Sequence, residues 1–116
     1  MQTQRILELI ELVAKLNAPD FATNLYIGNG KITIAAHAGG QTMGIAPTFS
    51  FSMKLEEEDI ATFWQAEFRL RSHQTDWELF KRLQGGGDDV TASLSEKQKQ
   101  IIFLMFGAKN ENRKYN

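Results

Sequence analysis

Hydrophobic and polar positions repeat with two different periods along this chain. Between Thr3 and Asn17 the apolar residues recur every three or four positions, which predicts an amphipathic helix. Pro19 disfavours helical geometry in the residue before it, so this helix is predicted to end at Asn17. From Asn24 to Ala36, and again from Phe49 to Lys54, apolar residues occupy alternate positions, and this period predicts strands.

The Asn29-Gly30 dipeptide predicts a two-residue hairpin turn. A type I′ turn needs a positive φ at both central residues, and Asn-Gly adopts that conformation readily. The resulting register pairs Gly28 with Lys31, Ile27 with Ile32, Tyr26 with Thr33 and Leu25 with Ile34. The apolar pairs then share one face with Phe49, Phe51 and Met53. If helices cover only that face, the opposite face, which carries Tyr26 and Thr33, is a candidate contact surface for a partner.

The second half of the chain has the pattern of three further helices. A helix is predicted from Glu56, with an apolar stripe of Ile60, Phe63, Trp64 and Phe68. The motif Thr75-Asp-Trp-Glu78 has the form of a capping box, which predicts a break at Ser72–Thr75 and a new helix after it. After the Gly85–Gly87 turn, a last helix is predicted to begin at Ser93 or Ser95 and to end at Gly107.

These elements follow the order α-β-β-β-α-α-α, which predicts an α+β fold. Its three-stranded antiparallel sheet, a meander, is covered on one face by helices. Residues 1–108 are predicted to form a single α+β domain, and residues 109–116 a polar C-terminal tail.

Composition narrows the classes of function. The 116 residues contain 42% apolar and 23% charged side chains, as expected for one globular domain. The absence of cysteine excludes thiol catalysis and Cys-ligated metal. Thirteen basic and fourteen acidic residues leave a net charge of −1, which argues against a nucleic-acid-coating protein. The apolar run Ile101–Phe106 is too short to span a membrane, and the N-terminus lacks the pattern of a signal peptide, so we expect a cytoplasmic protein without membrane association.

The sequence shows no catalytic or metal-binding constellation. His37 and His73, the only histidines, lack ligand spacing, and both are expected at the surface or at a sheet edge. We therefore expect no enzymatic activity, no metal and no cofactor. The glycine-rich loop at residues 38–47 is a candidate phosphate site because glycines expose backbone N–H groups, although it lacks the Gly-Lys-Ser/Thr ending of a P-loop.

Two charged features are candidate partner-binding sites. The first is the acidic segment Glu56, Glu57, Glu58 and Asp59, which either mimics nucleic-acid phosphates or complements the positive end of the helix dipole. The second is the i,i+4 pair Glu67 and Arg71, which projects into the predicted apolar stripe. This pair is either a partly buried specificity site or a solvated bridge.

The last helix carries a candidate oligomer contact. Ile101, Ile102, Phe103, Leu104, Met105 and Phe106 are apolar all round the helix. Such a helix is buried in a core or between chains, so a homodimer through the C-terminal helix is one expected arrangement.

The order of elements and the acidic segment also carry two resemblances. The order α-β-β-β-α resembles the double-stranded-RNA-binding domain, whose second helix opens with phosphate-binding lysines where this chain has Glu56–Asp59. The order α-β-β-β-α-α with an acidic helix start is similar to small phage-encoded anti-CRISPR proteins that occlude the nucleic-acid groove of a nuclease.

The sequence therefore predicts a small non-enzymatic protein that acts by protein–protein contact. A phage- or mobile-element-type inhibitor or adaptor, with another protein as its partner, is the leading hypothesis. The alternatives are a nucleic-acid-associated protein with double-stranded-RNA-binding topology and a binder of phosphate or nucleotide at loop 38–47.

Overall fold

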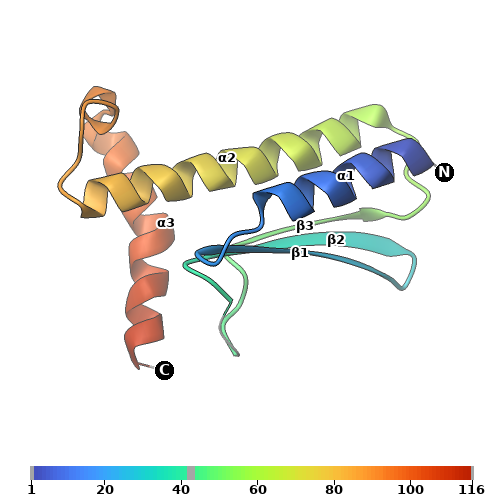
Figure 1. The fold of residues 1–116 in the computed structure, drawn as a ribbon, viewed down its shortest axis with the longest axis horizontal. Helices are drawn as coiled ribbons and strands as arrows, with labels where there is room; N and C mark the ends of the chain where they lie inside the picture. Colours follow the sequence, from blue (N-terminus) through green and yellow to red (C-terminus); the bar gives the residue numbers. More distant parts are fainter. Residues whose placement is uncertain (1, 42–43, 116) are drawn as a thin grey trace.

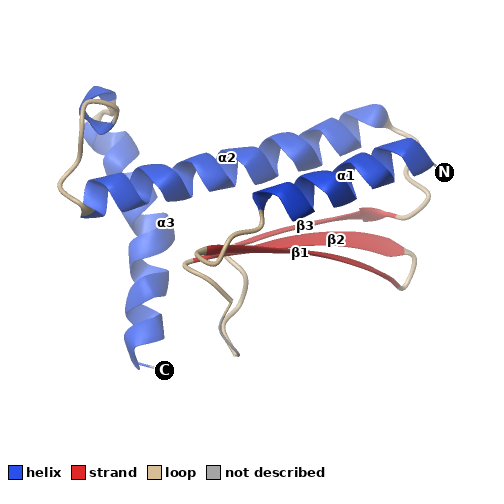
Figure 2. Ribbon diagram, viewed as in Figure 1, coloured by secondary structure: helices blue, strands red, loops and turns tan. Residues whose placement is uncertain are grey.

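The computed structural model describes the backbone of residues 2–41 and 44–115 and the side chains up to Gly107. Two helices cover one face of a three-stranded sheet, and a third helix crosses the end of the second (Figures 1 and 2). The elements are α1 (Thr3–Leu16), β1 (Phe21–Gly28), β2 (Lys31–Ala38), β3 (Phe49–Lys54), α2 (Ile60–Gln84), the 3₁₀ turn η1 (Thr91–Ser93) and α3 (Glu96–Tyr115). The predicted α+β fold and its order α-β-β-β-α-α-α are confirmed, with η1 counted as the short third helical element.

The sheet has the predicted meander topology and hairpin register. β2 lies between β1 and β3, and both pairings are antiparallel. Gly28 faces Lys31 and Leu25 faces Ile34, as the turn predicts. Asn29 and Gly30 have φ values of 54° and 73°, as a type I′ turn requires.

The core lies between the sheet and the two covering helices. Apolar residues of α1, of the inner sheet face and of α2 meet there, and two residues of α3 complete it at one end. Its most deeply buried large side chains are Phe21, Ile32, Ile34, Leu70, Phe80 and Phe106.

Helix α2 is continuous, so the predicted break at Ser72–Thr75 is wrong. The Thr75 hydroxyl does not cap a new helix; it donates to the carbonyl of Arg71 at 3.1 Å, one turn earlier in the same helix. The buried side of the helix continues without interruption from Leu70 through His73 to Trp77, across the expected break. Tertiary packing along this face favours a single long helix over the local capping signal.

The acidic segment precedes α2 instead of forming its first turn, which corrects the predicted start near Glu56. The helix begins at Ile60, and Oδ1 of Asp59 accepts the Ala61 N–H at 2.9 Å as the N-cap. Before it, Glu57 N–H donates to the Lys54 carbonyl in a turn that leaves β3. The Glu57 side chain accepts the Asp59 N–H at 3.0 Å, so these two acids define the entry into the helix.

Helix α3 starts with the capping box of Ser95. The Ser95 hydroxyl accepts the Gln98 N–H at 3.1 Å, and Gln98 Oε1 accepts the Ser95 N–H at 2.8 Å. The predicted end at Gly107 is wrong, because the helical backbone continues to Tyr115 and includes most of the segment expected as a tail. A glycine inside a helix costs only about 1 kcal/mol relative to alanine, so it does not by itself end one.

No helix within residues 2–41 and 44–115 is long and apolar enough to cross a bilayer.

Candidate functional site

The outer side of α2 presents two large aromatic residues to solvent. Trp64 is 60% exposed and Phe68 is 71% exposed, whereas Phe63 beside them is 3% exposed. The predicted stripe of Ile60, Phe63, Trp64 and Phe68 is therefore split between two sides of the helix. Ala66 and Leu70 are fully buried and occupy the positions that face the sheet. With the helix in this orientation, Trp64 and Phe68 lie on the side that faces solvent.

Glu67 and Arg71 lie on the same outer side as the two aromatics. Arg71 Nε donates to Glu67 Oε1 at 3.3 Å, and both side chains are nearly half exposed. The pair is thus a solvated i,i+4 bridge worth less than about 0.5 kcal/mol. Residues spaced as 64, 67, 68 and 71 are neighbours on a helix surface, so we call Trp64, Glu67, Phe68 and Arg71 the aromatic face.

The acidic segment lies at the N-terminal end of the helix that carries the aromatic face. Glu56, Glu58 and Asp59 are exposed, and Glu57 is half-buried. Trp64 follows Asp59 within little more than one helical turn. The segment and the aromatic face together make a surface with an acidic end and an apolar centre.

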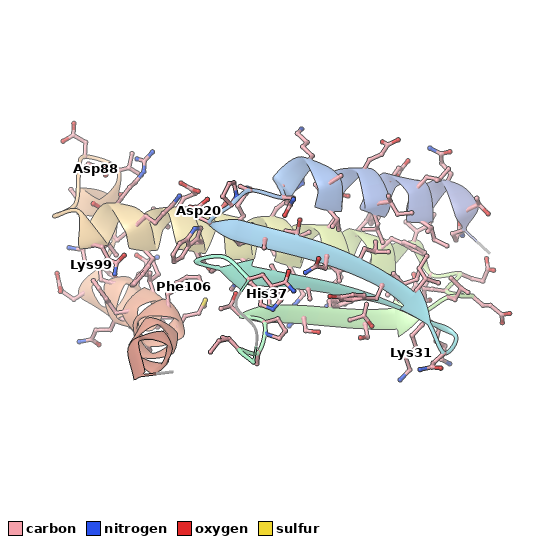
Figure 3. The ribbon with its side chains drawn as sticks, turned by 60° about the horizontal axis from the view of Figure 1, so that its bottom comes forward. Asp20, Lys31, His37, Asp88, Lys99 and Phe106 are labelled. Atoms are coloured by element: carbon pink, nitrogen blue, oxygen red, sulfur yellow. The ribbon has the colours of Figure 1, made fainter. Side chains whose placement is uncertain are left out.

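The sheet face opposite the helices carries polar residues at its hairpin end. Tyr26 is 55% exposed, and the hydroxyls of Thr33 and Ser52 form a hydrogen bond at 3.0 Å. Lys31 lies at the same end, as Figure 3 shows from this side, and it faces Lys54 in the register. Tyr26 and Thr33 are therefore accessible on the open face, as the alternation predicts.

Both histidines are buried, so the expectation of surface or edge positions is wrong. His37 is 7% exposed and His73 is 6% exposed. His73 Nε2 lies 2.8 Å from the Thr48 hydroxyl. The rings of Phe21, Phe49 and Phe106 have centroids within 5.2–5.8 Å of the His73 ring.

The contacts of His73 have a structural consequence. The Thr48 hydroxyl also donates to the Ala36 carbonyl at 3.1 Å and accepts the Ala38 N–H at 3.0 Å. His73 thus joins α2 to the end of the loop between β2 and β3. Neighbours this distant in sequence leave no local signal that would place a histidine in a core.

The glycine-rich loop uses its first amides internally. Gly39 N–H donates to the Asp20 carbonyl at 2.7 Å, and Gly40 N–H donates to the His37 carbonyl at 3.1 Å. A Cβ at Gly40 would lie 2.9 Å from the Pro19 carbonyl oxygen, so close backbone approach accounts for this glycine. Residues 42 and 43 of the candidate site lie outside the described residues. The amides of Gly39 and Gly40 therefore support the loop and the start of β1.

An ion pair ties the start of β1 to α2. Asp20 accepts from Lys81 Nζ at 2.6 Å and from Trp77 Nε1 at 3.1 Å. The hydrogen bond from Lys81, with that from Trp77, lowers the pKa of Asp20 below its ordinary value, and the bond to Asp20 raises the pKa of Lys81. The polar groups of Asp20, Trp77 and Lys81 are all used in hydrogen bonds within this cluster. The cluster therefore has a structural role.

The apolar run of α3 is divided between core and solvent. Ile102 and Phe106 are buried against α2, and Met105 is half-buried. On other sides of the helix, Ile101 is 50%, Phe103 44% and Leu104 74% exposed. Phe106 lies near the end of the sheet opposite Lys31, and Lys99 and Asp88 lie farther out (Figure 3). The six predicted contact residues therefore do not form one continuous surface.

Among the residues that the structure describes, no group of three His, Asp or Glu side chains is placed to hold a metal ion. No family model matches this chain, and neither the curated proteins nor the solved structures give a significant match.

Proposed function

We propose that this protein is a small non-enzymatic inhibitor or adaptor that acts in the cytoplasm by binding another protein through the aromatic face. The exposure of Trp64 and Phe68 is the observation that carries the proposal. Large apolar side chains grouped on a surface are more informative than single exposed ones, and Trp, Tyr and Arg are enriched among the residues that dominate binding energy at protein interfaces. Here a tryptophan, a phenylalanine and an arginine lie together on one rigid helix.

The charge of the neighbouring acidic segment indicates the chemistry of the partner. Carboxylates at Glu56, Glu58 and Asp59 are exposed at one end of the aromatic face. A complementary partner has an apolar pocket with basic side chains beside it. The basic groove of a nucleic-acid-processing protein has this character, and an inhibitor bound there excludes the nucleic acid. A phage or mobile-element origin fits this role.

Affinity capture with surface variants tests the proposal. The immobilised protein is compared with a Trp64→Ala/Phe68→Ala variant and with a Leu7→Ala/Ile10→Ala control, which shortens two apolar side chains of α1 that are 48% and 40% exposed. We expect the parent and the control to capture the same protein in stoichiometric amount. The aromatic variant should retain less than roughly a tenth of it, because two truncated hot-spot residues cost more than about 1.4 kcal/mol.

Two results would contradict the proposal. One is equal recovery of the same protein by all three baits, which would place the contact outside the aromatic face. The other is the absence of any stoichiometric partner for the parent. A competition assay refines a positive result, because the purified partner should release bound nucleic acid when the parent is added and keep it when the aromatic variant is added.

We also propose self-association through α3, with a second copy of the chain packed on its exposed side. Leu104 supports this arrangement because it is 74% exposed near the middle of a helix of 20 residues. If the twofold axis passes near the middle of α3, the α3 helices of the two copies pack antiparallel. The same surface of α3 then forms the contact in both copies.

A further inference from the structure

Two lysines face each other at the hairpin end of the open sheet face. Lys31 and Lys54 are direct partners in the β2–β3 register, and both are exposed. Like charges placed directly opposite one another in an antiparallel pair are destabilising. Within the described part of the chain, neither ammonium group forms an ion pair with a carboxylate. The three strands themselves contain no aspartate or glutamate.

The two lysines border a surface hollow of about 310 Å³. Its lining consists of Lys31, Ser52, Met53, Lys54, Glu57 and Thr62. Glu57 is the one carboxylate in this lining, and its Oε1 already accepts the Asp59 N–H. With two ammonium groups and one carboxylate, the lining has a net charge of +1.

We propose that this hollow binds the phosphate group of a small phosphorylated ligand. A lysine ammonium is a compact charge with three donors and is a common phosphate ligand in proteins. Lys31 and Lys54 approach the phosphate from two adjacent strands. The Ser52 hydroxyl donates a further hydrogen bond to the phosphate when Thr33 is the donor in the bond between the two hydroxyls. The bound dianion removes the repulsion between the lysines, so ligand binding and strand pairing reinforce each other.

The surroundings of the hollow favour a small ligand over a nucleic-acid strand. Glu56, Glu58 and Asp59 are exposed just beyond the end of β3. These carboxylates repel the successive phosphates of a polyanion, whereas one phosphate group between the two lysines avoids them.

Titration with inorganic phosphate and with AMP, followed by amide chemical shifts, tests this site. The parent is compared with Lys31→Gln, with Lys54→Gln and with a Lys15→Gln control on α1, where Lys15 is exposed and distant in sequence. We expect saturable shifts at residues 31 and 52–54 with both probes. Each glutamine at 31 or 54 should weaken binding roughly tenfold, and Lys15→Gln should leave it unchanged.

Thermal unfolding separates lost binding from lost folding. Because glutamine removes the repulsion between the lysines, Lys31→Gln and Lys54→Gln are expected to melt at or above the temperature of the parent. Absence of saturable shifts with millimolar AMP would overturn the proposal, as would equal affinity of the parent and both variants. A ten-nucleotide oligothymidylate that binds more than tenfold tighter than AMP would also overturn it, in favour of a nucleic-acid surface. None of these measurements depends on Trp64 or Phe68. The test of the phosphate site is therefore independent of the test of the proposed protein–protein contact.

Discussion

At the scale of single residues, the hairpin turn shows that backbone conformation alone can require a particular residue type. Gly30 illustrates the point, because its φ of +73° is one that residues with a Cβ rarely adopt, and yet a Cβ there would have nothing within 4 Å. The requirement for glycine at this turn is therefore conformational, and no contact is involved. The sequence predicts it directly, because the Asn-Gly turn and its flanking pairs are local.

Gly30→Val is predicted to lower the free energy of unfolding by about 1–2 kcal/mol, because a β-branched residue resists positive φ. Urea unfolding measures this loss. Gly28→Val is the matched control, since Gly28 has no positive φ and also has open space around its Cβ position. Valine suits a strand, so the control should be as stable as the parent or slightly more so. Equal stability of the two variants would show that the turn tolerates another conformation.

At the scale of elements, the long helix α2 shows where local signals and packing disagree. The capping-box motif at Thr75 predicts a break in the helix. Three buried residues spaced along the same segment favour a continuous helix, and the structure has the continuous helix. The energy scale explains this outcome. A cap contributes about 1 kcal/mol, whereas full burial of one large apolar side chain contributes about 1.5–3 kcal/mol.

Thr75→Ala is predicted to raise the free energy of unfolding by a few tenths of a kcal/mol, since alanine has the higher helix propensity inside a helix. If Thr75 capped a separate helix, the same substitution would cost about 1 kcal/mol. Asp59→Ala provides the comparison because Asp59 does cap α2, and it should cost about 1 kcal/mol. Chemical denaturation of both variants decides between the two structures by the sign of the Thr75 effect.

At the scale of the whole molecule, the distribution of exposed apolar residues is uneven. The helices cover one sheet face, while α3 contacts the body mainly through α2 and projects beyond the sheet (Figure 1). Ile101 and Leu104 are exposed on this projecting helix and are spaced i,i+3. Exposed apolar residues grouped in this way mark contact surfaces more often than scattered ones do.

We expect light scattering coupled to size exclusion to give a mass that rises with concentration from 13.1 kDa toward twice that value. The variant Ile101→Ser/Leu104→Ser should remain at the monomer mass, because it removes the apolar surface without touching the buried Ile102 and Phe106. Leu7→Ser/Ile10→Ser on α1 serves as the control and should associate like the parent. A monomer mass for the parent at every concentration would refute self-association through α3.

The sequence by itself determined the features that depend on near neighbours. The hairpin register, the first helix and the α+β order follow from the turn residues and the two hydrophobic periods, because these signals act over a few residues. Only the tertiary structure decided which sides of α2 and α3 are buried. It buried His73 among aromatic rings, turned Trp64 and Phe68 to solvent and placed Lys31 beside Lys54 at the edge of a hollow. Those outcomes depend on burial against partners distant in the chain, and the candidate binding surfaces are built from them.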